Sequence, residues 1–233
     1  MQNLTQNKQS NDTTNNAQNR LLAAAEAVFA EKGFDAASIR DITAQAKCNV
    51  AAVNYHFGNK ENLYNELFRR RLTEMREIRI KSIETVMAQK EPKPSLEQLL
   101  YAFSVAFLEP FFDKASGPLF MKLMIREMSD PRLQKQMFVD ELVKPTLQSL
   151  SKALTTICPG LTSEKVILSI ISLIGQLIQI MRISQLFDIH ELLGSKELTS
   201  DQMIDHIVEF SAAGIRANIN QTTERTNCND KSI

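Results

Sequence analysis

The 233-residue chain lacks several features that mark particular classes of protein. It has no tryptophan and three cysteines, Cys48, Cys158 and Cys228, which lie far apart and match no metal-ligand spacing. Such cysteines indicate reduced cytosolic thiols rather than a disulfide framework, and Cys48 is better explained as a small filler than as a redox switch. Basic and acidic residues balance at 27 each, so no global positive field attracts nucleic acid.

No hydrophobic run is long enough to predict a membrane span. The most apolar segment, Val166–Met181, is shorter than the roughly 20 residues that a span needs. Four polar residues also interrupt it: Ser169, Ser172, Gln176 and Gln179. Residues 1–19 are rich in Asn, Gln, Thr and Ser and have no apolar core, so they predict no secretory signal. We therefore expect a cytoplasmic protein with no membrane partner.

Catalytic and cofactor-binding motifs are also missing. There is no strand pattern and no Gly-rich phosphate loop. The runs Asp188-x-His190-Glu191 and Asp205-His206-x-x-Glu209 contain ligand-type residues, but each supplies one histidine and neither has a matched nucleophile. We expect no enzyme, no metal site and no cofactor, and we interpret these groups as solvated residues at helix ends.

Residues 19–62, by contrast, carry a dense pattern of short helices. Apolar residues at helical spacing predict a first helix that ends at Gly33 in a left-handed conformation. Ser38 is a good N-cap for a second helix and Asn49 for a third, in which Val50, Val53 and Phe57 are expected to turn inward. Lys47 lies in the turn between these two helices, and a lysine tolerates a positive φ less well than a glycine does. The short connection between the second and third helices is typical of a helix-turn-helix.

This segment resembles the DNA-binding domain of the TetR (tetracycline repressor-like) family of transcriptional regulators. The resemblance runs from about residue 17 to 75 and includes Tyr55-His56-Phe57-x-x-Lys60-Glu61-x-Leu63. The runs at 53–58 (Val-Asn-Tyr-His-Phe-Gly) and 126–131 (Arg-Glu-Met-Ser-Asp-Pro) further resemble a subgroup of drug- or xenobiotic-responsive repressors. The resemblance implies a repressor that leaves a palindromic operator on double-stranded DNA when a small molecule binds its C-terminal domain, although activation is an open alternative.

We expect the third helix to read DNA without an arginine, because no charged residue occurs between Asn49 and Asn59. Asn54 or Tyr55 and neighbouring methyl groups should face bases in half-sites that contain A·T pairs. Tyr55, His56 and Lys60 should hold phosphates, with a further charged contact from Arg40. The predicted DNA-binding residues are Ser38, Arg40, Asn49, Val50, Ala51, Ala52, Asn54, Tyr55, His56 and Lys60.

The rest of the chain also reads as helix, which makes the predicted class all-α: a three-helix N-terminal helix-turn-helix domain followed by a larger helical domain. We expect a disordered arm at 1–18, the DNA-binding domain at 19–62, an effector-binding and dimerisation domain at 63–219 and a disordered polar tail at 220–233. Pro145 should bend the helix predicted over 133–157.

The helix predicted over 164–187 is apolar on nearly every side, so it is either a central core helix or part of a subunit interface. We favour a homodimer in which it pairs with the last helix, as the resemblance also implies. The expected interface residues are Ile170, Ile174, Leu177, Met181 and Ile207. An apolar or aromatic effector would suit a pocket of aromatic, Met and polar residues, which we predict to be Phe103, Phe107, Met124, Arg126, Gln176 and Gln179.

The predicted function is therefore a homodimeric transcriptional regulator, most simply a repressor released by an apolar small molecule. The alternative is a helical ligand-binding or scaffolding protein without specific DNA binding. The intact segment from Ser38 to Lys60 favours the regulator, because it has no other evident use.

Overall fold

The computed structural model describes residues 2–113, 117–186 and 199–229, and all regular elements in these ranges are helices. The predicted all-α class is confirmed. The helices form two compact units. Unit 1 comprises residues 1–73 and 111–138, and unit 2 comprises residues 74–110 and 139–233.

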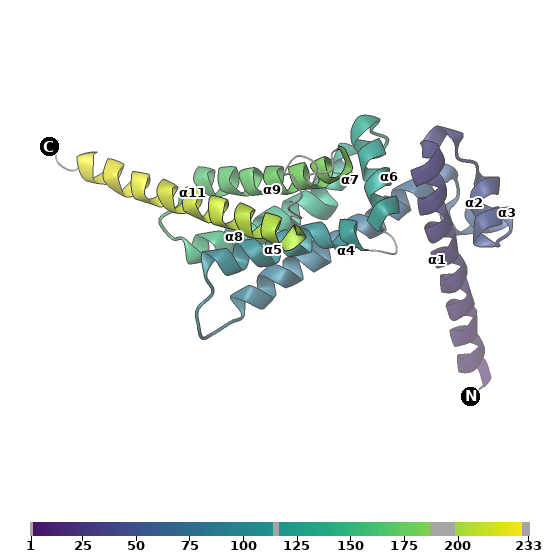
Figure 1. Ribbon diagram of the computed structural model, residues 1–233. Helices are drawn as coiled ribbons and strands as arrows, with labels where there is room; N and C mark the ends of the chain where they lie inside the picture. The colour runs from purple at the N-terminus through teal and green to yellow at the C-terminus, as the bar shows by residue number, and fades with distance from the viewer. Residues whose placement is uncertain (1, 114–116, 187–198, 230–233) are drawn as a thin grey trace. The chain divides into compact units, whose positions relative to one another are not determined.

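Unit 1 contains the predicted helix-turn-helix and two later helices (Figure 1). Its elements are α1 (Gln2–Ala36), α2 (Ile39–Ala46), α3 (Val50–Phe57), the first half of α4 (Lys60–Met87), α6 (Gly117–Ser129) and α7 (Lys135–Phe138). Helix α6 packs against α1, and its Leu123 enters the same core as Phe29 and Phe68. A segment that the sequence assigned to the effector-binding domain thus packs with the DNA-binding helices.

Helix α1 differs from the expectation at both ends. It begins at Gln2, although residues 1–18 were expected to be disordered; no proline or glycine interrupts the chain before Gly33, so the helix can extend. Gly33 has a φ of 78° and a ψ of 170°, which makes a kink after which helix resumes to Ala36. Positive φ was predicted there, but this ψ differs from that of a left-handed helical cap.

Unit 2 is a layered helical bundle in which the second half of α4 joins four further helices and a π-helical turn. These elements are α5 (Leu96–Phe112), η1 (Val139–Val143), α8 (Lys144–Ile157), α9 (Ser163–Leu186) and α11 (Ser200–Asn229). Helices α9 and α11 pack side by side, and α8 also packs on α9 (Figure 1). Helix α11 continues to Asn229 across most of the predicted disordered tail, and residues 230–233 of that prediction lie outside the described residues.

The predicted bend near Pro145 takes the form of the π-helical turn η1, which comes directly before α8. Proline has no N–H and its ring crowds the carbonyl four residues earlier, which here is that of Glu141. Arg76 satisfies this carbonyl instead, because its guanidinium donates to the Glu141 oxygen at 3.1 Å and to the Glu141 carboxylate at 3.2 Å. The irregular turn is therefore compensated from α4.

Candidate nucleic-acid interface and its connection to helix α6

The turn between α2 and α3 is fixed by local hydrogen bonds. The Ser38 hydroxyl accepts from the Asp41 N–H while the Asp41 carboxylate accepts from the Ser38 N–H, a reciprocal capping box. The Ser38 hydrogen bond, with help from Lys32, lowers the pKa of Asp41. The Asn49 side chain caps α3 by accepting from the Ala51 N–H at 3.0 Å. Both predicted caps are confirmed, and the two helices are held at a defined angle.

Lys47 ends α2 in the left-handed region, with a φ of 52° and a ψ of 45°. It is the one non-glycine residue with a positive φ among those that the structure describes. Its N–H bonds the Ala44 carbonyl at 3.2 Å, so the turn is closed despite the side chain. Lys47 thus adopts a backbone conformation that a glycine would adopt more freely.

Helix α3 presents two faces of different character. Val53 and Phe57 are buried against the core of unit 1, as predicted. Val50 is 42% exposed rather than turned inward, and Tyr55 is 80% exposed. Ala51 and Asn54 are exposed beside them, because positions 50, 51, 54 and 55 share one side of a helix with 3.6 residues per turn. Ala52 and His56 lie at the edge of this face and are half-buried.

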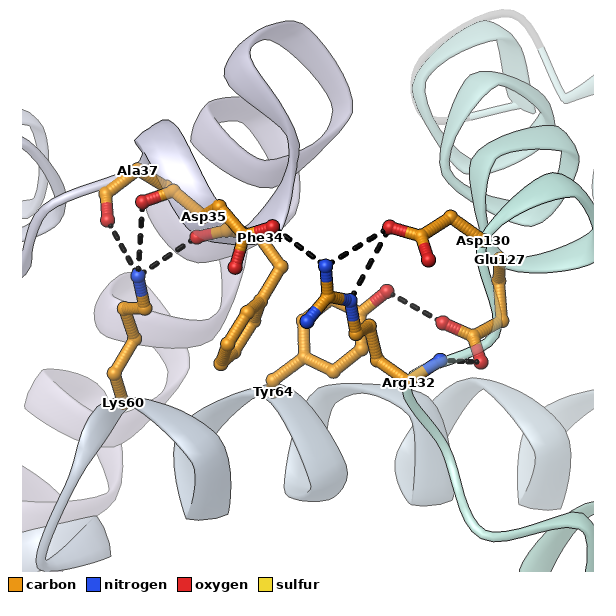
Figure 2. A network of polar contacts seen from close by, with 8 residues as sticks. All are labelled: Phe34, Asp35, Ala37, Lys60, Tyr64, Glu127, Asp130 and Arg132. Atoms are coloured by element: carbon orange, nitrogen blue, oxygen red, sulfur yellow. Dashed lines mark hydrogen bonds and ion pairs between the residues drawn. The ribbon is translucent and has the colours of Figure 1, made fainter.

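The predicted contact Lys60 has a different role from the one expected. Its ammonium donates to the carbonyl oxygens of Phe34 at 2.7 Å, Ala37 at 2.9 Å and Asp35 at 3.4 Å, as Figure 2 shows. It also lies 4.5 Å from the centre of the Phe34 ring. An ammonium group has three N–H donors, and all three are used here. Lys60 therefore closes the end of α1, and we correct its assignment as a phosphate contact.

Of the predicted residues, Arg40 is the charged side chain available to solvent. It is exposed and has no side-chain hydrogen bond or ion pair within the described part of the chain. Residues 19–62 contain five basic and five acidic residues, and one of the cations, Lys32, pairs with Asp41 at 3.1 Å. The segment therefore carries no net formal charge.

A polar network connects the loop after α6 to α1 and α4 within unit 1 (Figure 2). Tyr64 donates its hydroxyl to the Glu127 carboxylate at 2.8 Å. The other oxygen of Glu127 accepts from the N–H groups of Arg132 and Leu133, at 2.8 and 2.7 Å. The Arg132 guanidinium pairs with Asp35 and Asp130. Burial and the Glu127 carboxylate raise the pKa of Tyr64, so its hydroxyl stays a donor.

Arg126 adds a second connection between α6 and α1. Its guanidinium donates to the carbonyls of Ala30 at 3.1 Å and Glu31 at 2.9 Å. A Cβ atom on Gly33 would lie 3.0 Å from this guanidinium, a tight contact that the flexible arginine side chain would have to relieve by shifting, so the positive φ is the stronger reason for glycine here. Arg126 is therefore used to cap α1, and the structure does not place it in an effector pocket as the sequence suggested.

The predicted pocket residues are divided between the two units. Met124 and Arg126 belong to unit 1, whereas Phe103, Phe107 and Gln176 belong to unit 2. Phe103 and Phe107 are buried and in ring contact, which fits ordinary core packing. Gln176 donates to the Ser211 hydroxyl at 3.2 Å across α9 and α11, while Gln179 is exposed. The polar stripe on α9 is thus partly used in packing two helices of the same subunit.

A cleft of about 400 Å³ lies next to α3 in unit 1. It is lined by Gln18, His56, Phe57, Asn62, Asn65, Glu66 and Arg69. The lining places the predicted phosphate contact His56 beside amide side chains from α4. The sequence did not indicate this grouping, since Gln18 is distant along the chain.

The predicted interface residues lie mostly inside the subunit. Ile170, Leu177, Met181 and Ile207 are buried at 9% exposure or less, and Ile174 is half-buried. The apolar residues left uncovered are on the opposite side of the same two helices: Ile167, Leu168, Ile171 and Phe210, each between 42% and 66% exposed. The same side of α9 carries Gly175, and the same side of α11 carries Gly214. A Cβ atom at either position would have no neighbour within 4 Å. We name these six residues the outer face of α9 and α11.

No group of three or more metal-ligating side chains occurs among the described residues. The run at 188–191 lies outside them. Cys158 is buried and burial raises its pKa, while Cys48 is half-buried in the turn with its thiol directed to the Ala46 carbonyl. Cys158 therefore lacks the exposed, thiolate-stabilising surroundings of a reactive thiol.

Sequence reasoning missed Tyr64, Glu127 and Arg132, because only the fold brings residues 63 to 97 positions apart together. It also missed Arg79, which is 4% exposed. A signal for Arg79 was present, since it follows Met75 and precedes Ile83 at the four-residue spacing of a buried helical stripe.

Comparison with known proteins identifies the class to which this geometry belongs. Residues 21–67 match the family model described as bacterial regulatory proteins of the tetR family. Residues 96–215 match the C-terminal domain of the HTH-type transcriptional dual regulator CecR. The second match covers half of the chain. The chain is thus a transcriptional regulator and not an enzyme.

The chain belongs to the TetR family of helix-turn-helix, DNA-binding regulators, and its C-terminal domain is of the CecR type. It is 52% identical over 48 residues to CecR of Shigella flexneri, a segment that is 21% of either protein. It is 25% identical over 130 residues to YttP of Bacillus subtilis, described as a probable HTH-type transcriptional regulator; the match covers 53% of this chain and 61% of that one.

Solved structures share the fold over most of the chain. A TetR-family regulator from Streptomyces coelicolor superimposes with a TM-score of 0.61 at 20% identity, covering 86% of this chain and 96% of that one. One from Thermus thermophilus gives a TM-score of 0.56 at 18% identity, covering 83% and 97%.

Proposed function

We propose that the chain is a cytoplasmic, homodimeric repressor that binds a palindromic operator through α3 and is released when an apolar small molecule binds its C-terminal domain. The proposal rests on helix α3, which has one exposed, uncharged face and whose opposite side is buried in the core of unit 1. A helix held in this way can enter the major groove without rearranging.

Base reading falls to Asn54 and Tyr55, with methyl groups of Val50 and Ala51 beside them. Asparagine pairs with adenine in the major groove, and small apolar groups contact the thymine methyl, so the face favours half-sites that contain A·T pairs. Ala52 is half-buried and contributes less than the sequence suggested. Arg40 and His56, with the capping groups of α2 and α3, hold the phosphates.

The test of base reading is the affinity of Asn54→Ala for a duplex enriched from a random library by the wild-type protein. A lost amide–adenine pair should weaken binding by about 1–3 kcal/mol. Gln148→Ala, which removes an exposed amide from α8 in unit 2, is the matched control and should bind as the wild type does. Equal affinity of Asn54→Ala and wild type would contradict the assignment.

The homodimer rests on the outer face of α9 and α11. Helix α9 is apolar enough by length and composition to cross a membrane, with a mean hydropathy of 1.6 over Ser163–Arg182, yet only 28% of that window is buried within the subunit. A second copy packed by two-fold symmetry would cover the uncovered side, and the exposed glycines would allow its helices to approach closely. This pairing would also bring a second copy of α3 to the operator.

Ile171→Glu should yield a folded monomer, because Ile171 is 58% exposed in the subunit and the charge would oppose its symmetry mate. Leu177→Glu should instead unfold the chain, since Leu177 is fully buried. Sedimentation velocity and circular dichroism distinguish the two results. An unchanged dimer for Ile171→Glu would refute this interface, and association of the wild type only with detergent or lipid would favour a membrane role.

Effector release is proposed to act through α6 and α4. The segment 117–133 lies within the part of the chain that matches the CecR-type C-terminal domain, yet it is hydrogen-bonded to α1 and α4 beside the reading helix. Helix α4 follows α3 directly and extends into unit 2. A ligand that prefers one arrangement of these helices would alter operator affinity, whereas equal preference would not.

The resemblance of residues 53–58 and 126–131 to drug- or xenobiotic-responsive repressors suggests the compounds to test. A panel of apolar and antibiotic-like molecules should contain some that raise the melting temperature and also release the operator. Compounds that stabilise the protein but leave DNA affinity unchanged would contradict the coupling. The absence of any binder would favour a constitutive regulator.

A further inference from the structure

Arg79 is a charged residue in the core of unit 2. It lies on α4 within a buried stripe that includes Met75, Ile83 and Val86, and only 4% of its surface is exposed. Arginine is almost never fully buried unless it is paired. Its position therefore calls for a partner.

The contacts of Arg79 are few for its position. One terminal nitrogen lies 3.5 Å from the carbonyl oxygen of Phe107, and the guanidinium carbon lies 4.0 Å from the centre of the Phe107 ring. Its Nε is buried without any hydrogen-bond partner, and no carboxylate pairs with it in the described residues. The cation–π contact with the Phe107 ring is therefore the main electrostatic interaction of the Arg79 guanidinium.

Two other arginines of α4, by contrast, are paired with carboxylates. Arg71 is bound by both carboxylate oxygens of Glu26, each at 2.7 Å. Arg76, one turn before Arg79, is bound by the carboxylate and the carbonyl of Glu141. Both of these are more exposed than Arg79. The most deeply buried of the three guanidinium groups is thus the one without a counter-ion.

Burial lowers the pKa of Arg79 to about 9, so the group still carries its charge at neutral pH. A planar guanidinium with a free Nε and a weakly bound terminal nitrogen offers two parallel donors, which is the geometry that a carboxylate accepts. The Phe107 ring beside Arg79 is itself in ring contact with the fully buried Phe103, and the hydroxyl of Ser104 on the same helix is already donated to the Leu100 carbonyl.

We propose that Arg79 anchors the carboxylate of an effector whose remaining body is apolar, bound in unit 2 against Phe107 and Phe103. The single cation and the aromatic neighbours suit a monocarboxylate, because a phosphate would require more donors. This proposal rests on the proposed function of unit 2 as the effector-binding part of the protein and names the chemical class of its ligand.

Unit 2 contains a second buried polar group without a partner. The Thr146 hydroxyl, at the start of α8, is buried and has no hydrogen-bond partner. The bond between Arg76 and Glu141 ties the turn before α8 to the helix that carries Arg79. That turn is the π-helical segment η1, and such segments occur frequently at functional sites.

The experiment is calorimetric titration of the full-length protein with matched acids and amides: 2-naphthoate against 2-naphthamide, and decanoate against decanamide. Each pair shares its apolar body and differs in the charge of the head group. The wild type should bind at least one acid about tenfold more tightly than its amide. In Arg79→Met the acid and amide should bind equally, and Arg79→Lys should retain only part of the preference.

Arg79→Met replaces a buried charge by an apolar side chain of similar length, so the variant is expected to fold. Arg76→Gln removes a neighbouring but paired cation and should keep the acid preference. The proposal is overturned if no acid binds, if neither pair shows a preference, or if the preference survives in Arg79→Met. Operator binding is measured separately: acids that bind through Arg79 without releasing DNA support the site while refuting effector release.

Discussion

Replacing Lys60 by methionine tests whether this residue closes α1 or holds DNA. Methionine keeps an apolar side chain of similar length and removes the ammonium group. Two short hydrogen bonds, at 2.7 and 2.9 Å, and one longer bond would be lost. A hydrogen bond to a charged group contributes about 1.5–3 kcal/mol when buried, and a cation at a helix C-terminus about 0.3–1 kcal/mol.

Lys60 is half-buried, so water can reach some of the carbonyl groups that it leaves behind. We therefore expect a loss of about 2–3 kcal/mol in the free energy of unfolding, which is less than the sum for fully buried bonds. Urea unfolding followed by circular dichroism at a fixed protein concentration measures this loss, since the stability of a dimer depends on concentration.

The same variant should leave the salt dependence of operator binding unchanged. Arg40→Met is the matched control, because Arg40 is an exposed cation of the same domain without a side-chain partner among the described residues. It should keep the stability within about 0.5 kcal/mol and reduce the salt slope by about one unit per half-site. Stability unchanged in Lys60→Met together with a reduced slope would refute the capping role.

Three further changes test the local structure of unit 1. Lys47→Gly should stabilise the protein by about 0.5–1 kcal/mol in urea unfolding, because glycine adopts the left-handed conformation freely; no gain would mean that the turn is unstrained. Tyr64→Phe should cost about 1.5–2 kcal/mol by loss of the bond to Glu127, and the cost should vanish in a Glu127→Ala background. The pKa of Asp41 is lowered in the folded protein, so its contribution to the free energy of unfolding is complete above the ordinary value of 3.8 and is lost as the pH falls through the lower folded value. The destabilisation by Asp41→Ala should therefore shrink in acid. A destabilisation independent of pH would contradict the role of the Asp41 charge.

The local parts of the fold could be predicted from the sequence because short-range signals determine them. Ser38 and Asn49 cap the helices that follow, and Val53 and Phe57 lie on the buried side of α3. The TetR family assignment followed from the same segment. The family assignment did not depend on how the later helices pack.

The roles of individual site residues could not be predicted where distant packing decides them. Lys60 stands at the start of a helix, where a phosphate contact is reasonable, but the sequence does not show that the last carbonyls of α1 lie within reach. Ile170 and Ile171 are equally apolar, and only the positions of α8 and α11 decide that the first is buried and the second exposed.

The role of Arg126, which the sequence assigned to an effector pocket, likewise depends on packing between distant parts of the chain. Its place within an apolar run allowed a ligand anchor, an ion pair or a packing role. The fold directs it to backbone carbonyls of α1, while Arg79 of α4 is buried and its Nε has no hydrogen-bond partner. Its core position within a helical stripe is the reason why we propose Arg79 rather than Arg126 as the anchor.

The most direct test of the account is the DNA motif enriched from a randomised duplex library by the wild-type protein and by Asn54→Ala side by side. The account predicts for the wild type a two-fold symmetric motif with A·T pairs in each half-site and half-site centres about 34–36 Å apart along the duplex, or a multiple of that distance. Asn54→Ala should lose the preference at one position in each half-site. An asymmetric motif, no enriched motif, or the same motif from both proteins would contradict it.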